Sequence, residues 1–328
     1  MRRRDFLAVA AGAAAMSPVP SWAQRAATIP RVGVLWHAGS AEEEDVYLSV
    51  VKKAFGNLGY VEGKTIILAH RFPAERAELF HSMAQELAAS KLDVIIAVTE
   101  LGAMELRSAT QTTPIVFVLA PDPVASGLVD SLAHPGGNVT GLSLMSVDLS
   151  GKRLALLKEA VPGLARLTLI VDPKDPASRR VVSSSQAAAR ELGLELRVAE
   201  VASPGAIDSA LAELVAAGSE ALIVGPGSMM FNERARIGAF VSAKKLPTEV
   251  AVAEMVPLGP LLSYGPDFPD YFRRAAALVD RILRGAKPAD LPVEQPSRFL
   301  LTINQKAAKS MGLAIPPALL TSADDVLE

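Results

Sequence analysis

The sequence predicts an α/β protein of two doubly wound, Rossmann-like lobes joined by crossover hinges. From Arg31 onward, short β-branched runs alternate with longer segments rich in Ala, Leu and Glu, which is typical of repeated βαβ units and a mostly parallel sheet. The alternation occurs in both halves of the chain. Near-continuous apolar runs such as the one at 94–98 indicate strands that helices cover on both faces.

Length and composition agree with two domains. The chain has 328 residues and is 50% hydrophobic, so it can bury a substantial core. It has no cysteine, which excludes disulfides, thiolate metal sites and a lipid-modified cysteine anchor, so we expect a freely diffusing monomer. The formal net charge of -2 and the 5% aromatic content argue against a nucleic-acid partner, which normally meets a basic or base-stacking surface.

The first half of the chain contains four strands and three helices in alternation. A turn-forming cluster at 134–141 then runs into a strand that ends near Met145, where we expect the first crossover between lobes. The expected strands are 31–36, 65–70, 93–98 and 114–119, and the expected helices are 42–58, 77–89 and 101–109.

The second half repeats the pattern and then returns. We assign the strand at 261–264 and the helix at 271–284 to the first lobe, and the strand at 299–303 and the helix at 305–311 to the second. The expected N-terminal lobe is therefore 31–145 with 254–285, and the C-terminal lobe is 146–253 with 286–328. The other strands of this half are 167–171, 194–201, 221–224 and 248–252, with helices at 179–192, 207–216 and 234–244.

Residues 1–23 have the order of a cleavable secretory signal peptide. Basic residues come first, an apolar run follows at 8–16, and small residues stand before Gln24. The Arg-Arg-x-Phe-Leu core at 3–7 resembles a twin-arginine signal. The alternative is a frayed Ala-rich helix. The apolar run is far shorter than the roughly 20 residues that span a bilayer, so we expect export to the periplasm without stable membrane insertion.

Several segments, spread over most of the chain beyond the signal, resemble the substrate-binding proteins of ABC transporters, in particular those related to tryptophan-binding proteins. That resemblance implies a type I periplasmic binding protein fold. The segments are PIVF at 114–117, DPVASGLV at 122–129, PGGNVTGLS at 135–143, ILRGAKPADLPV at 282–293, INQKAAKSMGL at 303–313 and IPP at 315–317.

The resemblance implies capture of a small organic solute, an amino acid or related carboxylate, and its delivery to an ABC permease and the ATPase of that permease. No chemistry and no cofactor are implied. One alternative is a ligand-presenting sensor for a membrane receptor kinase, which the sequence does not separate from transport. An exported α/β enzyme is disfavoured, because the sequence has no Gly-x-Ser-x-Gly, His-Glu-x-x-His or nucleotide-binding glycine motif, and its histidines lack metal-ligand spacing.

Candidate ligand contacts follow from the fold class. In open parallel sheets, ligands bind outside the carboxyl ends of the strands, where loops and helix N-termini present free N–H groups. The candidates of the first lobe are Trp36, His37, Ala38, Gly39, Ser40, Thr99, Glu100, Leu101, Ala120, Pro121, Asp122 and Ser143. Those of the second lobe are Asp172, Pro173, Gly225, Pro226, Gly227, Ser228, Ala253 and Glu254, with Tyr264 added from the segment that returns to the first lobe.

Each of these candidates also has a structural interpretation. Trp36 could stack on a flat ligand or cap the core, and His37 could donate to a ligand carboxylate or lie at the surface. Thr99 and Glu100 could bind an anionic ligand group or simply begin a helix. Asp122 could hold a ligand ammonium or cap a helix that contains 124–132.

The glycine-containing loop at 225–228 has two interpretations as well. Glycine has no side chain to obstruct a ligand, so the backbone of this loop could approach a bound molecule closely. The loop could equally be a tight turn between a strand and a helix.

Overall fold

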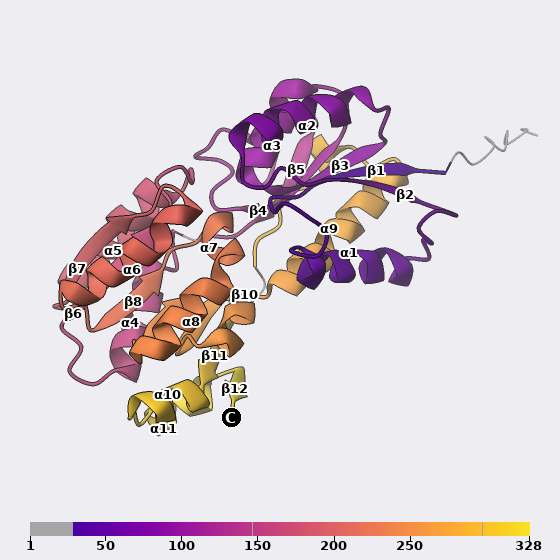
Figure 1. Ribbon diagram of the computed structural model, residues 1–328. Helices are drawn as coiled ribbons and strands as arrows, with labels where there is room; N and C mark the ends of the chain where they lie inside the picture. Colours follow the sequence, from indigo (N-terminus) through magenta and orange to yellow (C-terminus); the bar gives the residue numbers. More distant parts are fainter. Residues whose placement is uncertain (1–28, 146, 297) are drawn as a thin grey trace, which may run out of the picture.

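The computed structural model describes residues 29–145, 147–296 and 298–328. The export signal expected at 1–23 lies outside the described residues. Two α/β lobes lie side by side, each built on its own sheet, so the two-lobed fold expected from the sequence is confirmed (Figure 1). Within the described ranges, no helix is long and apolar enough to cross a membrane.

The first lobe is built on a sheet of five parallel strands. In spatial order they are β2 (Ile67–Arg71), β1 (Arg31–Leu35), β3 (Val94–Thr99), β4 (Ile115–Ala120) and β5 (Val139–Ser143). Four helices cover it: α1 (Asp45–Asn57), α2 (Ala77–Ala89), α3 (Glu100–Ala109) and α9 (Phe268–Leu283). Val34 and Ile96 pack toward α1 and α9, whereas Leu35 and Ile95 pack toward α2 and α3, as the alternation of a strand requires.

The second lobe is built on a seven-stranded sheet, in which β10 and β11 are antiparallel and the other neighbours are parallel. Its spatial order is β12 (Asp325–Leu327), β11 (Phe299–Asn304), β10 (Leu262–Pro266), β9 (Thr248–Val250), β8 (Ala221–Val224), β6 (Arg166–Val171) and β7 (Glu195–Glu200). Leu169 and Val171 face the helix layer of Leu154 and Val181, and Val224 faces the opposite layer.

Helices cover both faces of this second sheet as well. The first layer contains α4 (Ser150–Ala160), α5 (Ser178–Glu191) and α10 (Gln305–Met311), and the second contains α6 (Ile207–Ala216), α7 (Ser228–Asn232) and α8 (Arg234–Lys244). The remaining helices are α11 (Pro317–Ser322) and the short 3₁₀ turns η1 (Pro204–Ala206), η2 (Ala253–Leu258) and η3 (Pro288–Asp290).

The lobe boundaries differ from those expected. Strand β10 was expected in the first lobe, but Leu262 pairs with Glu249 of β9 and with Ile303 of β11 in the second sheet. Only α9 of the segment 254–285 packs on the first lobe. An apolar strand run carries no information about which of two sheets it will join, and this explains the error.

The segment after α9 also stays with the first lobe longer than expected. Val293 lies in the core of α2 and α3, and Glu294 forms a parallel bridge with Leu142 at the end of β5. The Thr140 hydroxyl donates to the Leu291 carbonyl at 2.7 Å. The chain therefore leaves the first lobe for the last time after Glu294, and β11, α10, α11 and β12 complete the second lobe.

The helix expected over 124–132 is absent, and this prediction is wrong. The backbone at 123–127 forms turns, in which Asp122 Oδ1 accepts from the Ala125 N–H at 3.1 Å and the Ser126 N–H donates to the Asp122 carbonyl. Gly127 then adopts a φ of 72°, a left-handed conformation that ends a helical turn after one round.

Candidate ligand-binding cleft

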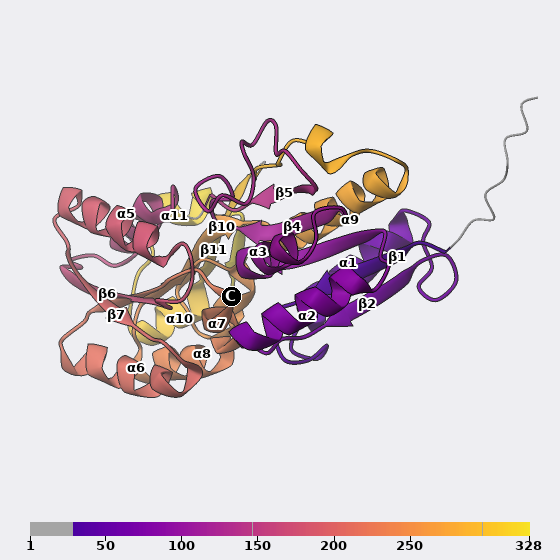
Figure 2. The same ribbon diagram turned by 90° about the horizontal axis from the view of Figure 1, so that it is seen from above.

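A cavity of about 390 Å³ lies between the two lobes, at the carboxyl ends of strands from both sheets. Loops after β1, β2, β3 and β4 enter it from the first lobe, and loops after β6 and β8 enter it from the second. In Figure 2, as in Figure 1, α7 of the second lobe lies next to the first lobe. Residues of both lobes line the cavity. The expectation that ligands bind outside the carboxyl ends of the strands, called the strand-end rule below, therefore locates a cavity.

The first lobe contributes the start of α3 to the cavity. Thr99 caps this helix, because its Oγ1 accepts from the Gly102 N–H at 3.2 Å. Glu100 is the first residue of the helix, and Leu101 points its apolar side chain toward the cavity. The capping interpretation of Thr99 is thus confirmed by its hydrogen bond, while its position on the wall keeps it within reach of a ligand.

Glu100 has a buried carboxyl group, and only one of its two oxygens accepts a hydrogen bond. Its side chain is 2% exposed, and Oε2 accepts from the Asp122 N–H at 3.4 Å. Its Oε1 has no hydrogen-bond partner among the described residues. Burial, reinforced by the nearby charge of Asp175, raises the pKa of Glu100 to about 7, so this group is only partly ionised near neutral pH.

Two aspartates line the cavity from the turn after β6. Asp172 Oδ1 accepts from the Lys174 N–H at 2.9 Å, and Asp175 Oδ1 accepts from the Ala177 N–H at 2.8 Å. These bonds hold both carboxyl groups in place by way of the backbone. Burial raises the pKa of Asp175 to about 6, and burial also raises the pKa of Asp172.

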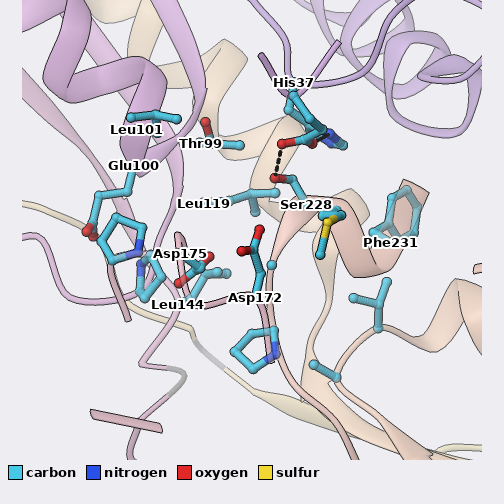
Figure 3. Close-up of a pocket in the computed structure, with 18 of the residues that line it drawn as sticks. His37, Thr99, Glu100, Leu101, Leu119, Leu144, Asp172, Asp175, Ser228 and Phe231 are labelled. Atoms are coloured by element: carbon cyan, nitrogen blue, oxygen red, sulfur yellow. Dashed lines mark hydrogen bonds and ion pairs between the residues drawn. The ribbon is translucent and has the colours of Figure 1, made fainter. Parts of the chain in front are cut away.

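Glu75 connects the two lobes across the cavity. It belongs to the first lobe, yet its Oε2 accepts from the Ser228 hydroxyl at 2.8 Å and its Oε1 accepts from the Asn232 amide at 3.2 Å, both on α7 (dashed line at Ser228 in Figure 3). The sequence analysis missed this residue. It lies just beyond β2, so the strand-end rule applied to that strand as well would have included it.

His37 is not at the surface, where one interpretation put it. It is 2% exposed, its Nδ1 lies 2.9 Å from Glu75 Oε1, and its Nε2 lies 3.4 Å from Glu44 Oε1. Burial alone would lower the pKa of His37, but the hydrogen bond to Glu75 and the charge of Glu44 outweigh it and raise that pKa above its ordinary value. His37 therefore positions Glu75 on the wall of the cavity.

Aromatic and aliphatic side chains form most of the remaining wall. The ring of Tyr47 stacks on Phe231 of the second lobe with centroids 5.4 Å apart, and on Phe268 at 6.3 Å. Leu119 and Leu144 lie between the polar groups of the two lobes (Figure 3). Such a mixture of an apolar wall with a few polar groups is typical of a small-molecule site.

The structure brings together about half of the predicted contacts. Ten of them line the cavity: His37, Thr99, Glu100, Leu101, Pro121, Asp172, Pro226, Gly227, Ser228 and Tyr264. The others do not line it: Trp36, Ala38, Gly39, Ser40, Ala120, Asp122, Ser143, Pro173, Gly225, Ala253 and Glu254.

Trp36 is a core residue, and the ligand-stacking interpretation is wrong. Its side chain is 0% exposed, and its ring lies between Phe72 and Phe272 at centroid distances of 6.3 and 6.0 Å. Its Nε1–H donates to His70 Nδ1 at 2.9 Å. The residue continues the side of β1 that faces α1 and α9, which turns it away from the cavity.

Other strand-end candidates are also buried in the fold. Ala38 and Ala120 are 0% exposed, and the Ser143 carbonyl accepts from the Tyr271 hydroxyl at 2.8 Å. Gly225 packs on β6, where a Cβ would lie 2.7 Å from the Ile170 carbonyl oxygen, so the close-approach interpretation fits Gly227 alone.

Asp122 lies apart from the main cavity. It shares a second hollow of about 260 Å³ with Ser143, and its Oδ2 is 3.9 Å from Arg180 Nε of the other lobe. Among the residues that the structure describes, no group of three or more His, Asp or Glu side chains is arranged to hold a metal ion.

Comparison with known proteins identifies the family. Residues 40–327 match the family model described as ABC transporter substrate binding protein. The chain belongs to this family. The finding confirms the resemblance seen in the sequence segments, and a solute-binding role in ABC transport agrees with a cavity between two lobes.

Three relatives place this ABC substrate-binding protein more closely. A tyrosine-binding protein of Clostridioides difficile is 26% identical over 262 residues, which cover 80% of this chain and 75% of the relative. An ABC domain of Streptococcus pneumoniae in complex with L-Trp is 25% identical, has a TM-score of 0.84 and covers 92% of this chain and all of that one. A conserved domain protein of Vibrio cholerae is also 25% identical with a TM-score of 0.84, over 91% of this chain and all of that one.

Proposed function

We propose that this protein is the periplasmic solute-binding component of an ABC uptake transporter, and that it captures an amino acid or a closely related small molecule between its lobes. The observation that carries the proposal is the cavity itself, which both lobes enclose with apolar walls and a few fixed polar groups. Its volume of about 390 Å³ suits a ligand of amino-acid size. The two relatives described as binding tyrosine and L-Trp support the same class.

The wall favours a ligand with an apolar or aromatic body. Tyr47, Phe231 and Phe268 form one stacked cluster, and Leu101 and Leu119 lie on the side of the first lobe. A flat side chain gains both apolar burial and ring-to-ring contact against such a surface. The carboxylates and hydroxyls from both lobes would hold the polar end of the ligand.

Capture would work by stabilising the closed arrangement of the lobes. A ligand shifts a conformational equilibrium only by its difference in affinity for the two states, so contacts from both lobes are needed. Thr99 and Leu101 of one lobe and Asp172 and Ser228 of the other line the same cavity, and each would contact a single bound molecule. We further propose that the closed form docks on a membrane permease, where the ligand is released for transport.

Calorimetric titration of the purified protein with the twenty amino acids tests the proposal. We expect saturable binding of at least one apolar or aromatic amino acid with one site per chain. Leu101→Trp should weaken that binding at least tenfold, because the larger side chain fills the cavity. Met104→Trp is the matched control, since Met104 lies on the same helix, is 39% exposed and does not line the cavity. Absence of binding to every amino acid, or equal loss in both variants, would contradict the proposal.

A further inference from the structure

The cavity carries an excess of negative charge that comes from both lobes. Glu75 and Glu100 line it from the first lobe, and Asp172 and Asp175 line it from the second. The charge of Glu75 acts on both aspartates and that of Asp175 acts on Glu100, so the four groups lie near one another across the cleft.

The cations on the wall are largely committed to other partners. Arg153 is 3% exposed and pairs with buried Glu249 through contacts of 2.7 and 2.8 Å. His37 lies between Glu44 and Glu75. Lys174 lies on an exposed part of the wall, within the turn that Asp172 holds by its backbone bond.

Arg180 is the other cation close to this group. Its charge acts on Glu100 and Asp175, and its Nε lies 3.9 Å from Asp122 Oδ2. Its Nε and Nη2 have no hydrogen-bond partner among the described residues, and the residue does not line the cavity. Among the described residues, Glu75 is thus paired with His37, Glu100, Asp172 and Asp175 have no ion pair, and Lys174 is the one lining cation without an ion pair.

Glu100 and Asp175 show the cost of burying carboxyl groups of like charge close together. A carboxyl oxygen without a hydrogen bond is costly when it is buried, and Glu100 Oε1 is such an atom at the wall of a ligand-sized cavity. The raised pKa values of Glu100 and Asp175 have the same origin, since burial and like charge both disfavour the ionised forms. A cation within the cavity would relieve the repulsion among these carboxyl groups.

We propose that the cavity recognises its ligand through a positively charged amine shared by carboxylates of both lobes, and that a ligand carboxylate is dispensable. The inference rests on the proposed function and deepens it by naming the recognised group. An ammonium has three donors and no acceptor, so it can bond Asp172 or Asp175 on one lobe and Glu75 on the other. A ligand carboxylate meets no uncommitted arginine on the described wall and adds to the negative charge.

A matched series of ligands separates the amine from the carboxylate. We would titrate the purified protein by calorimetry with tyrosine, tyramine and 3-(4-hydroxyphenyl)propionate, and then with leucine, 3-methylbutylamine and 4-methylpentanoate. In at least one series, the amine should bind at least as tightly as the amino acid. The acid without an amine should bind at least 100-fold more weakly in both.

Three variants locate the effect. Asp172→Asn and Asp175→Asn remove the charge but keep an oxygen that can accept the backbone bonds of Lys174 and Ala177, so the turn is preserved. Each should weaken amine binding at least tenfold. Glu213→Gln removes the same charge from an exposed site on α6 of the same lobe and should change binding less than twofold.

The possible results separate the two proposals. If an amino acid binds and its matching amine does not, the inference is overturned and the solute-binding proposal stands. Equal effects of all three variants would also overturn it, because the charge would then act only at long range. If none of the six compounds binds, this inference fails, and the titration with all twenty amino acids decides the proposed function separately.

Discussion

At the scale of a single residue, the position of Glu100 has two opposite effects on the pKa of its carboxyl group. As the first residue of α3, a carboxylate complements the positive end of the helix dipole, and the Asp122 N–H supplies one hydrogen bond. The same position buries the group to 2% exposure beside Asp175. The second effect is larger, which is why the pKa of Glu100 rises to about 7 instead of falling.

A pH-dependent effect of Glu100→Gln on stability follows. The pKa of Glu100 is about 7 in the folded protein and near the ordinary 4.5 in the unfolded chain, so the folded state binds the proton more tightly. Its contribution to stability is fully present below pH 4.5, is lost as pH rises toward 7, and stays lost above. Glu100→Gln should raise the free energy of unfolding by about 3 kcal/mol at pH 8 and by less than about 1 kcal/mol at pH 5.

Urea denaturation of the wild-type protein and the variant at both pH values measures this difference. Gln retains an oxygen that can accept from the Asp122 N–H, so the variant tests the charge and not the hydrogen bond. Glu213→Gln on exposed α6 serves as control and should change stability by less than about 0.5 kcal/mol. A gain of equal size at pH 5 and pH 8 would contradict the assignment.

Trp36 and His37 show what sequence can predict at this scale. The end of a strand can be located to within one or two residues, and both residues were candidates for that reason. Neighbouring side chains of a strand point to opposite faces, however, so a shift of one position decides between the core and the cavity. The aromatic residue lies in the core, and the histidine beside it lies at the cavity.

At the scale of elements, helix and strand positions follow closely from the apolar pattern. The helices expected at 77–89, 207–216, 234–244 and 305–311 have the same bounds in the structure, as does the strand at 221–224. A 3.6-residue apolar pattern explains the helices at 77–89 and 207–216, and a continuous apolar run explains the strand. The helix at 234–244 has no strong pattern of this kind. The sheet to which β10 belongs could not be predicted, because strand pairing depends on contacts far apart in the sequence.

Helix α4 was not predicted, because a buried charged residue interrupts its apolar pattern. Leu154, Leu157 and Ala160 form a normal apolar face, but Arg153 lies on the buried side as well. The reason becomes visible only with β9 in place, where Glu249 supplies the buried partner at 2.7 Å. In the sequence alone, Arg153 interrupts the apolar pattern of the helix, because its partner Glu249 lies 96 residues away.

Gly141 in β5 is required by its contact with the neighbouring strand. A Cβ at this position would lie 2.1 Å from the carbonyl oxygen of Phe117 in β4 and 2.6 Å from Phe117 Cγ. No side-chain rotation can relieve a contact with backbone. Gly141→Ala should therefore lower the free energy of unfolding by about 2 kcal/mol or more, measured by chemical denaturation.

Gly56→Ala is the matched control for this prediction. Gly56 is exposed on α1, and a Cβ there would meet nothing within 4 Å. Alanine is a better helix former than glycine, so this variant should be stabilised by up to about 1 kcal/mol. Wild-type stability of the Gly141→Ala protein would show that β4 and β5 lie farther apart than described.

At the scale of the whole molecule, the two lobes are held face to face by contacts that cross the cavity. Glu75 of the first lobe accepts from Ser228 and Asn232 of the second, and Tyr47 stacks on Phe231. Of these side chains, the strand-end rule had predicted Ser228, whereas it did not reach Glu75, Asn232, Tyr47 and Phe231. The rule located the cavity, whereas the other groups that join its walls became visible only from the assembled lobes.

A crystal structure of the protein with a bound amino acid or amine tests the central claim most directly, namely that a small solute is held between the lobes. We predict one ligand in the cavity, with its nitrogen within hydrogen-bond distance of Asp172 or Asp175 and its apolar body against Leu101 or Phe231. A ligand that contacts one lobe alone, or that occupies the hollow beside Asp122 and Ser143, would contradict the claim.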